Sequence, residues 1–151
     1  MCLTIDKYRN RKTSSGYVPH ILQEDMIVWK EGYIKEQTNP DGSSTKIFES
    51  PVTHFKYTIG EVYTIDKLEI KQEISLFGKP LCSVYEGFHS YANIPASIFA
   101  HNSDLDPCAI AGCVIPKGSK VYFGTSSDIV SDHIRIDGFR ELSKIKEDFK
   151  I

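Results

Sequence analysis

No stretch of the 151-residue sequence approaches the roughly 20 consecutive apolar residues that a membrane-spanning helix needs. No continuous run of lysine and arginine is present either, and the formal net charge of −2 gives no long-range attraction to phosphate backbones. These absences argue against a membrane protein and against a nucleic-acid-binding protein. The first residues, MCLTIDKYRNRK, become charged too early for a secretory signal, so we expect a cytoplasmic protein.

Signatures of catalysis and of cofactor binding are also missing. The sequence contains no P-loop, no G-x-S-x-G nucleophile motif and no paired carboxylates, so we expect no cofactor. Cys108 and Cys113 form a C-x4-C pair with His101 upstream, but a zinc ribbon needs a second pair. We therefore predict no metal site, and thiols that stay reduced, as is usual in the cytoplasm.

What the sequence does contain is the composition of a globular domain. Hydrophobic residues make up 40% and charged residues 25% of the chain, and 151 residues are enough to bury a core without disulfides or metals. No repeat, low-complexity tract or linker divides the sequence. We expect a single domain that spans residues 1–151.

Short β-branched and aromatic runs between turn residues predict a mainly antiparallel β-sheet. The run DMIVWK is expected to turn Ile27 and Trp29 toward the core. The turn NPDG would join a strand that ends near Glu36 to one that holds Ile47. The nearly all-apolar run CAIAGCVI predicts a strand buried on both faces, and HIRI at 133–136 predicts the last strand.

Two segments predict helices. Asn93 is a plausible N-cap and Pro95 fits the first turn, which indicates a short helix over PASIFAHN at 95–102. Leu142, Ile145 and Phe149 recur at helical spacing and predict a C-terminal helix from Glu141 to Phe149. The expected fold class is therefore α+β, a mainly antiparallel β-sheet with one short internal helix and a C-terminal helix.

The segment YEGFHSYANIP, from Tyr85 to Pro95, holds the main candidate for a binding site. His89 follows a strand and a glycine and precedes the predicted helix, at a junction where loops often carry binding groups. Ser90 and Tyr91 add hydroxyl groups beside it, and the first N–H groups of the helix could hold an anion. A histidine packed between two aromatic residues and bonded to a carbonyl would explain the same pattern, so both interpretations stay open.

Three further residues complete the predicted ligand-binding set. Tyr85 has the strand parity of His89, Lys117 in a turn could supply positive charge, and Ser131 could supply a hydrogen bond. The ligand would be a small polar or nucleotide-like molecule, or a protein partner. The other polar residues of TSSDIVSDHI fit caps of their own backbone.

The blocks MCLTI, YEGFHSY, CVIPKGSKVYFG and IVSDHIRI together resemble a group of small, largely uncharacterised proteins of bacteriophages and Bacteroides-type gut bacteria. Its members typically show a lysine after the first strand, then K-Y-x-x-G, G-L-H-S-F and C-I-I-P-K-G-S. The matching positions here are Lys30, 56–60, 87–91 and 113–119. The resemblance implies a phage or bacterial context but no defined activity.

Two enzyme hypotheses remain beside this resemblance. A weaker, fold-level resemblance to ADP-ribosyltransferases would give parts in an NAD site to His89, to Tyr57 or Tyr63, and to Glu141, although the S-T-S motif of one branch is absent. The second is a Cys/His hydrolase: removal of the initiator methionine would leave Cys2 with an α-amine that could act as its base, as in N-terminal nucleophile hydrolases. Leu3 replaces the glycine of the M-C-G start found in glutamine amidotransferases, and a small buried cysteine on an edge strand would explain Cys2 as well.

Three classes of function follow. The first is a phage or bacterial accessory protein that binds a small polar or nucleotide-like ligand, or a protein partner, at the His89 face. The second is an enzyme of one of the two kinds above. The third is a structural or virion-associated protein without a chemical site. Exposed strand edges in a sheet-rich fold also leave a homodimer open.

Overall fold

The computed structural model describes residues 3–51, 55–74, 76–78, 80–84, 86–94, 109–142 and 144. In that part of the chain it contains strands and no helix. The strands are β1 Leu3–Thr4, β2 Arg11–Thr13, β3 Gly16–Val18, β4 His20–Ile21, β5 Met26–Thr38, β6 Ser44–Glu49, β7 Lys56–Tyr57, β8 Val62–Thr64, β9 Ile70–Ile74, β10 Pro80–Val84, β11 Phe88–Tyr91, β12 Ala109–Ile115, β13 Lys120–Phe123, β14 Asp128–Ser131 and β15 His133–Glu141.

The predicted α+β class is wrong, because the described residues form a nearly all-β structure. The internal helix predicted at 95–102 lies outside the described residues, as do residues 145–149 of the predicted C-terminal helix. Its first residue, Glu141, belongs to β15, which pairs along β12 from Val114↔Arg135 to Ala109↔Glu141. Beyond Glu141 only Leu142 and Lys144 of this segment are described, and both have helical backbone, so strand pairing replaces the predicted helix only at its first residue.

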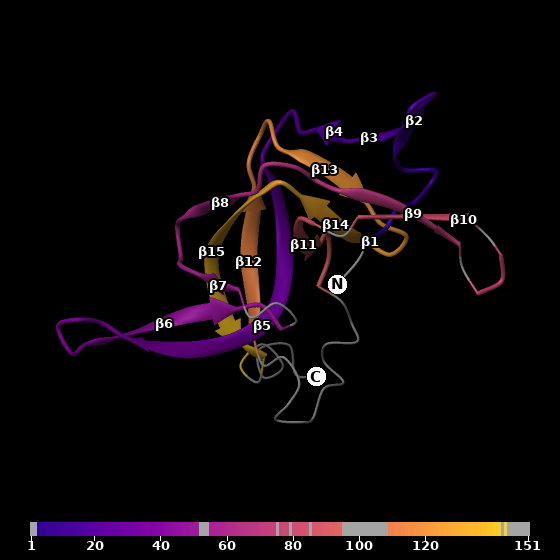
Figure 1. Cartoon of the computed structure of the whole chain (residues 1–151). Helices are drawn as coiled ribbons and strands as arrows, with labels where there is room; N and C mark the ends of the chain where they lie inside the picture. The colour runs from indigo at the N-terminus through magenta and orange to yellow at the C-terminus, as the bar shows by residue number, and fades with distance from the viewer. Residues whose placement is uncertain are drawn as a thin grey trace.

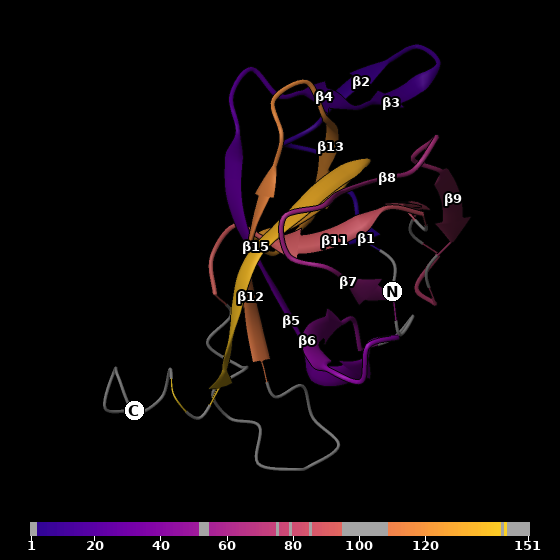
Figure 2. The same cartoon turned by 90° about the vertical axis from the view of Figure 1, so that its left-hand side faces the viewer.

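Ten strands form one antiparallel sheet in the order β4-β13-β14-β11-β5-β12-β15-β8, with β6 and β7 attached through β5. Three strands form a smaller sheet in the order β1-β10-β9, and β2 and β3 form a separate hairpin. Figure 1 shows β5 and β12 side by side through the middle of the molecule, and Figure 2 shows β15 running along β12.

The long strand β5 serves two parts of the sheet. Its first half pairs with β12 over Met26 to Gly32, and its second half pairs with β6 over Tyr33 to Thr38. The turn between β5 and β6 is closed by the Asn39 N–H, which donates to the carbonyl of Ser43 at 2.7 Å. The predicted hairpin around NPDG is therefore confirmed.

Gly32 lies at the point where β5 passes from β12 to β6. A Cβ atom at this position would lie 2.5 Å from the carbonyl oxygen of Glu49 and 2.5 Å from the ring of Phe48. Only a residue without a side chain allows this approach of backbone and ring. Phe48 is fully buried as a result.

The large sheet curls around its own core. Val121 of β13 and Ile134 of β15 lie on strands far apart in the sheet order, yet they belong to one buried cluster. We call this cluster the inner core. Its members are Val28, Phe48, Tyr57, Phe88, Ala109, Ala111, Cys113, Ile115, Val121, Ile129, Ile134 and Ile136.

A second buried cluster, the outer core, lies on the opposite face of β13 and β14. It joins Tyr122 and Val130 of that face to the first residues of the chain and to β10. The small sheet and the N-terminal segment therefore cover this face and form a second layer. The buried members of the outer core are Leu3, Ile5, Val84, Tyr122 and Val130.

The predicted orientation of the first half of β5 is wrong. Val28 and Lys30 are buried, whereas Ile27 is 68% exposed and Trp29 lies half-buried on the other face. Alternation places residues 28, 30 and 32 on one face, and the inward position of a lysine hides this pattern from a search for apolar residues. Val28 is the register partner of Cys113 on β12, and both side chains belong to the inner core.

We expect Gly32→Ala to lower the free energy of unfolding by about 1–3 kcal/mol, because the added methyl group overlaps the Glu49 carbonyl and the Phe48 ring. Gly138→Ala in β15 is the matched control, since a Cβ there meets no atom within 4 Å. Urea unfolding of both variants is the measurement. Equal stability of the two variants would contradict the close approach at Gly32.

Candidate functional site

His89 lies in β11, between β14 and β5, after Gly87, whose φ of 145° turns the chain into the strand. Its register partner is Val130, and Phe88 pairs with Ser131. Val130 belongs to the outer core and Phe88 to the inner core. The side chain of His89 therefore points toward the outer core, under the layer formed by the N-terminal segment.

The ring of His89 is enclosed there. Its Nε2 atom is buried and has no hydrogen-bond partner among the described residues. Burial and, to a smaller extent, the nearby charge of Lys30 lower the pKa of His89 to about 4. The imidazole is thus uncharged at neutral pH, and this environment favours the interpretation of His89 as a core residue over that of a solvent-facing acid or base.

The other predicted ligand-binding residues do not converge on His89. Ser131 pairs with Phe88 and therefore faces the inner core, and Ser90 lies on that same face with a buried hydroxyl that lacks a described partner. Tyr91 shares the face of His89 and is half-buried. Burial raises the pKa of the Tyr91 phenol, and the carboxylates of Glu31 and Asp128 add to the shift.

Lys117 is exposed in the turn between β12 and β13, where its backbone N–H donates to the carboxylate of Asp25 at 2.8 Å. Tyr85 lies outside the described residues, as do Cys2, His101 and Cys108. The sequence-predicted set thus divides into an outward turn, an inner-core face and an outer-core face. Among the described members, His89 and Tyr91 share the outer-core face, and Ser90 and Ser131 share the inner-core face.

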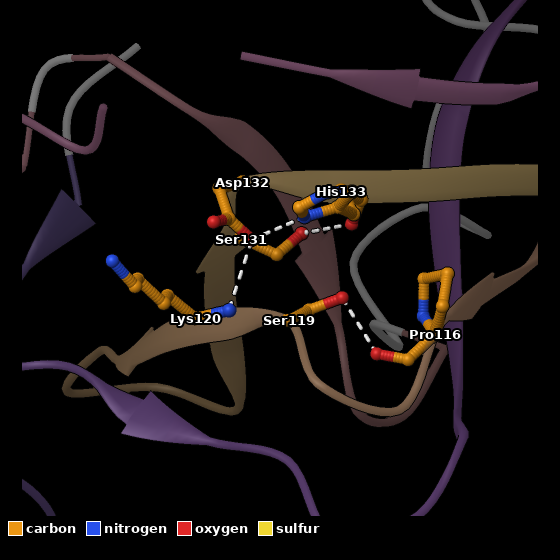
Figure 3. A network of polar contacts seen from close by, with 6 residues as sticks. All are labelled: Pro116, Ser119, Lys120, Ser131, Asp132 and His133. Carbon is orange, nitrogen blue, oxygen red and sulfur yellow. Dashed lines mark hydrogen bonds and ion pairs between the residues drawn. The ribbon is translucent and has the colours of Figure 1, made fainter. Parts of the chain in front are cut away.

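Ser131 belongs to a polar network that fixes the junctions of β13, β14 and β15 (Figure 3). Its hydroxyl donates to the carbonyl of His133 at 2.9 Å, and the Asp132 carboxylate accepts the Lys120 N–H at 2.9 Å. The same carboxylate lies 2.6 Å from Nδ1 of His133. The Ser131 hydroxyl donates to the backbone carbonyl of His133, whereas a catalytic triad needs a hydrogen bond from the serine hydroxyl to the histidine ring, so these contacts serve the strand junction.

A second buried polar group is the lysine that the resemblance matched. Lys30 is 7% exposed, and its ammonium donates to the carbonyl of His89 while lying 5.6 Å from the centre of the Tyr57 ring. The strands β11 and β5 are paired through a single register pair, Tyr91↔Trp29. Beyond that pair, the side chain of Lys30 reaches across and satisfies a carbonyl that would otherwise be buried alone.

The chemistry of this buried group is that of a structural contact. Burial lowers the pKa of Lys30 from 10.5 to about 8, and Cys113 and Glu31 oppose the shift. Burial also raises the pKa of the Cys113 thiol to about 12, although Lys30 acts in the opposite direction. At neutral pH the thiol is protonated, and both groups are enclosed in the inner core, so neither is placed to attack a substrate.

The residues named for an NAD site are also apart. Tyr57 and Tyr63 pack edge to face at 5.1 Å between ring centres, within an aromatic cluster that includes Phe55 and Phe88. His89 faces away from this cluster, and Glu141 is exposed at the end of β15. The described residues therefore do not assemble that site.

A hollow of about 800 Å³ lies instead between the N-terminal segment, the β2–β3 hairpin and β10. We call it the N-terminal groove. Its lining residues are Thr4, Ile5, Asp6, Lys7, Tyr8, Lys12, Tyr17, Gln72, Leu81, Cys82 and Thr125. It lies over the outer core, which includes Ile5, so the layer that covers His89 also carries the groove.

The wall of the groove is fixed by Asn10. The amide of this buried side chain donates to the carbonyls of Asp6 and Phe123, both at 2.7 Å, and its oxygen accepts the Phe123 N–H at 3.0 Å. The side chain thus imitates a strand against β13. The Asp6 carboxylate accepts the N–H of Tyr8 at 2.8 Å and holds the turn that presents Lys7 and Tyr8.

Cations and aromatic rings alternate along this wall. Nζ of Lys7 lies 5.0 Å from the ring centre of Tyr8, and Nζ of Lys12 lies 5.3 Å from that of Tyr17. Lys12 and Tyr17 are register partners in the β2–β3 hairpin. Tyr8 is 86% exposed, so one face of its ring is open to a ligand. Such rings and charges suit a planar anion.

Sequence reasoning missed this groove although its signal was present. The run KYRNRK contains four basic residues in six positions, but Tyr8 and Asn10 interrupt it, so it does not form a continuous basic block. The segment instead resembles a polar loop. What makes it a wall is the contact of Asn10 with β13, which is 113 residues away in the sequence.

No protein-family model matches this sequence, and the chain shows no significant similarity to a curated protein or to a solved structure. Within the described ranges, no helix has the length and apolar character needed to cross a membrane. The same residues contain no group of three or more histidine, cysteine or acidic side chains that could hold a metal ion. Function must therefore be argued from the groove and the cores.

We expect the burial of His89 to make the protein sensitive to acid. Its pKa is about 4 in the folded chain, against an ordinary value of 6.5, so the unfolded state binds more protons between these values and stability falls as pH drops from 6.5 toward 4. The loss from this group is roughly 2–3 kcal/mol. His89→Leu, which cannot titrate, should show a shallower loss in urea unfolding across this range; parallel curves would contradict the burial of the imidazole.

We expect the burial of Lys30 to make the stability of the protein depend on pH in the alkaline range. Because its pKa is about 8 when folded, against an ordinary value of 10.5, the unfolded chain binds more protons in that interval and stability rises with pH across it. The stability of the wild type relative to Lys30→Met should rise by about 3 kcal/mol over the interval. Lys46→Met, at an exposed position of β6, is the control for the loss of a lysine at the surface. A constant difference between wild type and Lys30→Met would overturn the buried ammonium.

Proposed function

We propose that this protein is a binding module whose ligand is a nucleotide-like anion held in the N-terminal groove. The observation that carries the proposal is the pairing of a lysine with a tyrosine at two points of the rim, Lys7 with Tyr8 and Lys12 with Tyr17. The hollow of about 800 Å³ falls within the usual range for small-molecule sites, ~300–1,000 Å³.

Each part of such a ligand meets a suitable group. Phosphate oxygens would be held by the ammonium groups of Lys7 and Lys12. A base would stack on the open ring of Tyr8, which is 86% exposed. Thr4, Gln72 and Thr125, which also line the groove, would supply hydrogen bonds.

The proposal keeps the predicted class of ligand but moves its place. The ligand would lie on the outer side of the layer that covers His89, and not against the imidazole itself. The net charge of −2 for the whole chain is compatible with this, because the groove is lined by two lysines, Lys7 and Lys12, against one carboxylate, Asp6. The enzyme hypotheses gain no support from the enclosed groups of the inner core.

We expect Tyr8→Ala to weaken binding of a nucleotide or a short single-stranded oligonucleotide at least fivefold, since stacking of one base contributes about 1–3 kcal/mol. Tyr8→Phe keeps the ring and should bind like the wild type. Lys12→Glu should weaken binding and reduce its dependence on salt. Fluorescence anisotropy with a labelled oligonucleotide and calorimetry with the mononucleotide separate the two sources of the ligand.

Lys46→Glu on the exposed ribbon of β6 is the matched charge control and should leave the affinity nearly unchanged. The proposal fails if neither probe binds the wild type. It also fails if Lys46→Glu weakens binding as much as Lys12→Glu, because the attraction would then be a property of the whole surface and not of the groove.

A further inference from the structure

The segment that contains β9 is nearly symmetric in sequence. LEIKQEISL, residues 68–76, has Gln72 at its centre. Apart from Glu69 and Ser75, positions at equal distances from the centre hold the same apolar residue or opposite charges. The pairs are Leu68 with Leu76, Ile70 with Ile74, and Lys71 with Glu73.

The structure places this segment at an edge. β9 pairs with β10 on one side and is the last strand in the order β1-β10-β9, so in the described part of the chain no strand pairs with its other side. The hairpin of β9 and β10 extends away from the large sheet in Figure 1. An unpaired strand edge offers a row of backbone donors and acceptors to another chain.

Apolar residues collect at the end of this hairpin. Ile74 is 78% exposed, Leu76 is fully exposed and Phe77 is 90% exposed. Their counterparts in the symmetric sequence, Leu68 and Ile70, are half-buried against the outer core. One end of the segment is thus covered within the chain, and the other end is left without a cover.

We propose that a second copy of this chain pairs with the free edge of β9, antiparallel and about a two-fold axis at Gln72. In this register Ile74 lies opposite the partner's Ile70, and Leu76 reaches the partner's Leu68. Residues directly opposite in an antiparallel pair share a face, so the exposed apolar end of each copy gains an apolar neighbour.

Charge supports a second copy as the occupant. In the same register Lys71 stands opposite the partner's Glu73 twice, once on each side of the axis. A symmetric antiparallel pair in this register therefore sets opposite charges, and not like charges, across the axis. The two small sheets would join into one continuous sheet through the two β9 strands.

The size of the contact sets its strength. A pairing of two five-residue strands with one apolar end from each copy is small beside the ~1,600 Å² of a standard interface. The dimer should therefore dissociate on dilution. The inference does not depend on the ligand of the N-terminal groove, because the test below contains no ligand.

Charge reversal gives a decisive test by analytical ultracentrifugation. Lys71→Glu or Glu73→Lys alone places like charges opposite each other and should yield monomers at concentrations where the wild type is dimeric. The double variant restores opposite charges and should restore the dimer. A mixture of the two single variants should form a heterodimer, because each then supplies the charges that the other lacks. Lys46→Glu is the control and should remain dimeric.

Crosslinking tests the axis directly. Gln72→Cys should form a disulfide between two copies under mild oxidation, since opposed residues of an antiparallel pair have Cα atoms at about 4.5–5.5 Å. The variant also needs Cys82→Ser, because Cys82 is the register partner of Gln72 within the chain. Thr45→Cys with Cys82→Ser is the control and should not crosslink. A monomeric wild type at all concentrations, or single reversals that leave association and crosslinking unchanged, would overturn the dimer.

Discussion

Beyond the register pair of Tyr91 and Trp29, β11 and β5 are no longer paired, and the ammonium of Lys30 takes the place of the missing ladder by donating to the His89 carbonyl. The rest of the sheet depends on this contact. It lets β5 leave β11 and continue, past Gly32, into the ribbon that it forms with β6. The ribbon in turn brings Phe48 over the inner core. The charged Lys30 is buried because, without it, the His89 carbonyl would have no hydrogen-bond donor at the point where β11 and β5 separate.

The two faces of β11 then have different roles. The face of Phe88 belongs to the inner core, where aromatic side chains from β6, β7 and β8 pack around it. The face of His89 meets the layer made by the N-terminal segment and β10. Because that layer is held by backbone contacts such as Ile5 N–H to the Cys82 carbonyl at 2.8 Å, it can carry both the groove and the free edge of β9 on its outer side.

Several features of the fold could be predicted from the sequence. The turn NPDG and the flanking alternation gave the hairpin of β5 and β6, because both signals are local. The run AIAGCVI gave a central strand, because an uninterrupted apolar run must be buried on both faces, and residues of β12 belong to two different clusters. Which face of β5 points to the core could not be predicted, since the buried Lys30 interrupts the apolar alternation that would reveal the inward face. The start of the predicted C-terminal helix was wrong at Glu141, because the pairing of β15 with β12 extends through that residue.

The candidate site also has features that the sequence determines and features that only the tertiary structure determines. The sequence by itself determined the residues that carry chemistry, among them His89, Lys30 and the basic run KYRNRK, and it determined the symmetric pattern around Gln72. Only the tertiary structure decided which of these face solvent. His89 and Ser131 lie on opposite faces because their strands pair with Phe88 opposite Ser131. Lys7 and Lys12 line a groove because Asn10 bonds to β13 far along the chain. Parity within one strand is local, whereas the layer that covers each face comes from a distant segment, and no local pattern encodes that choice.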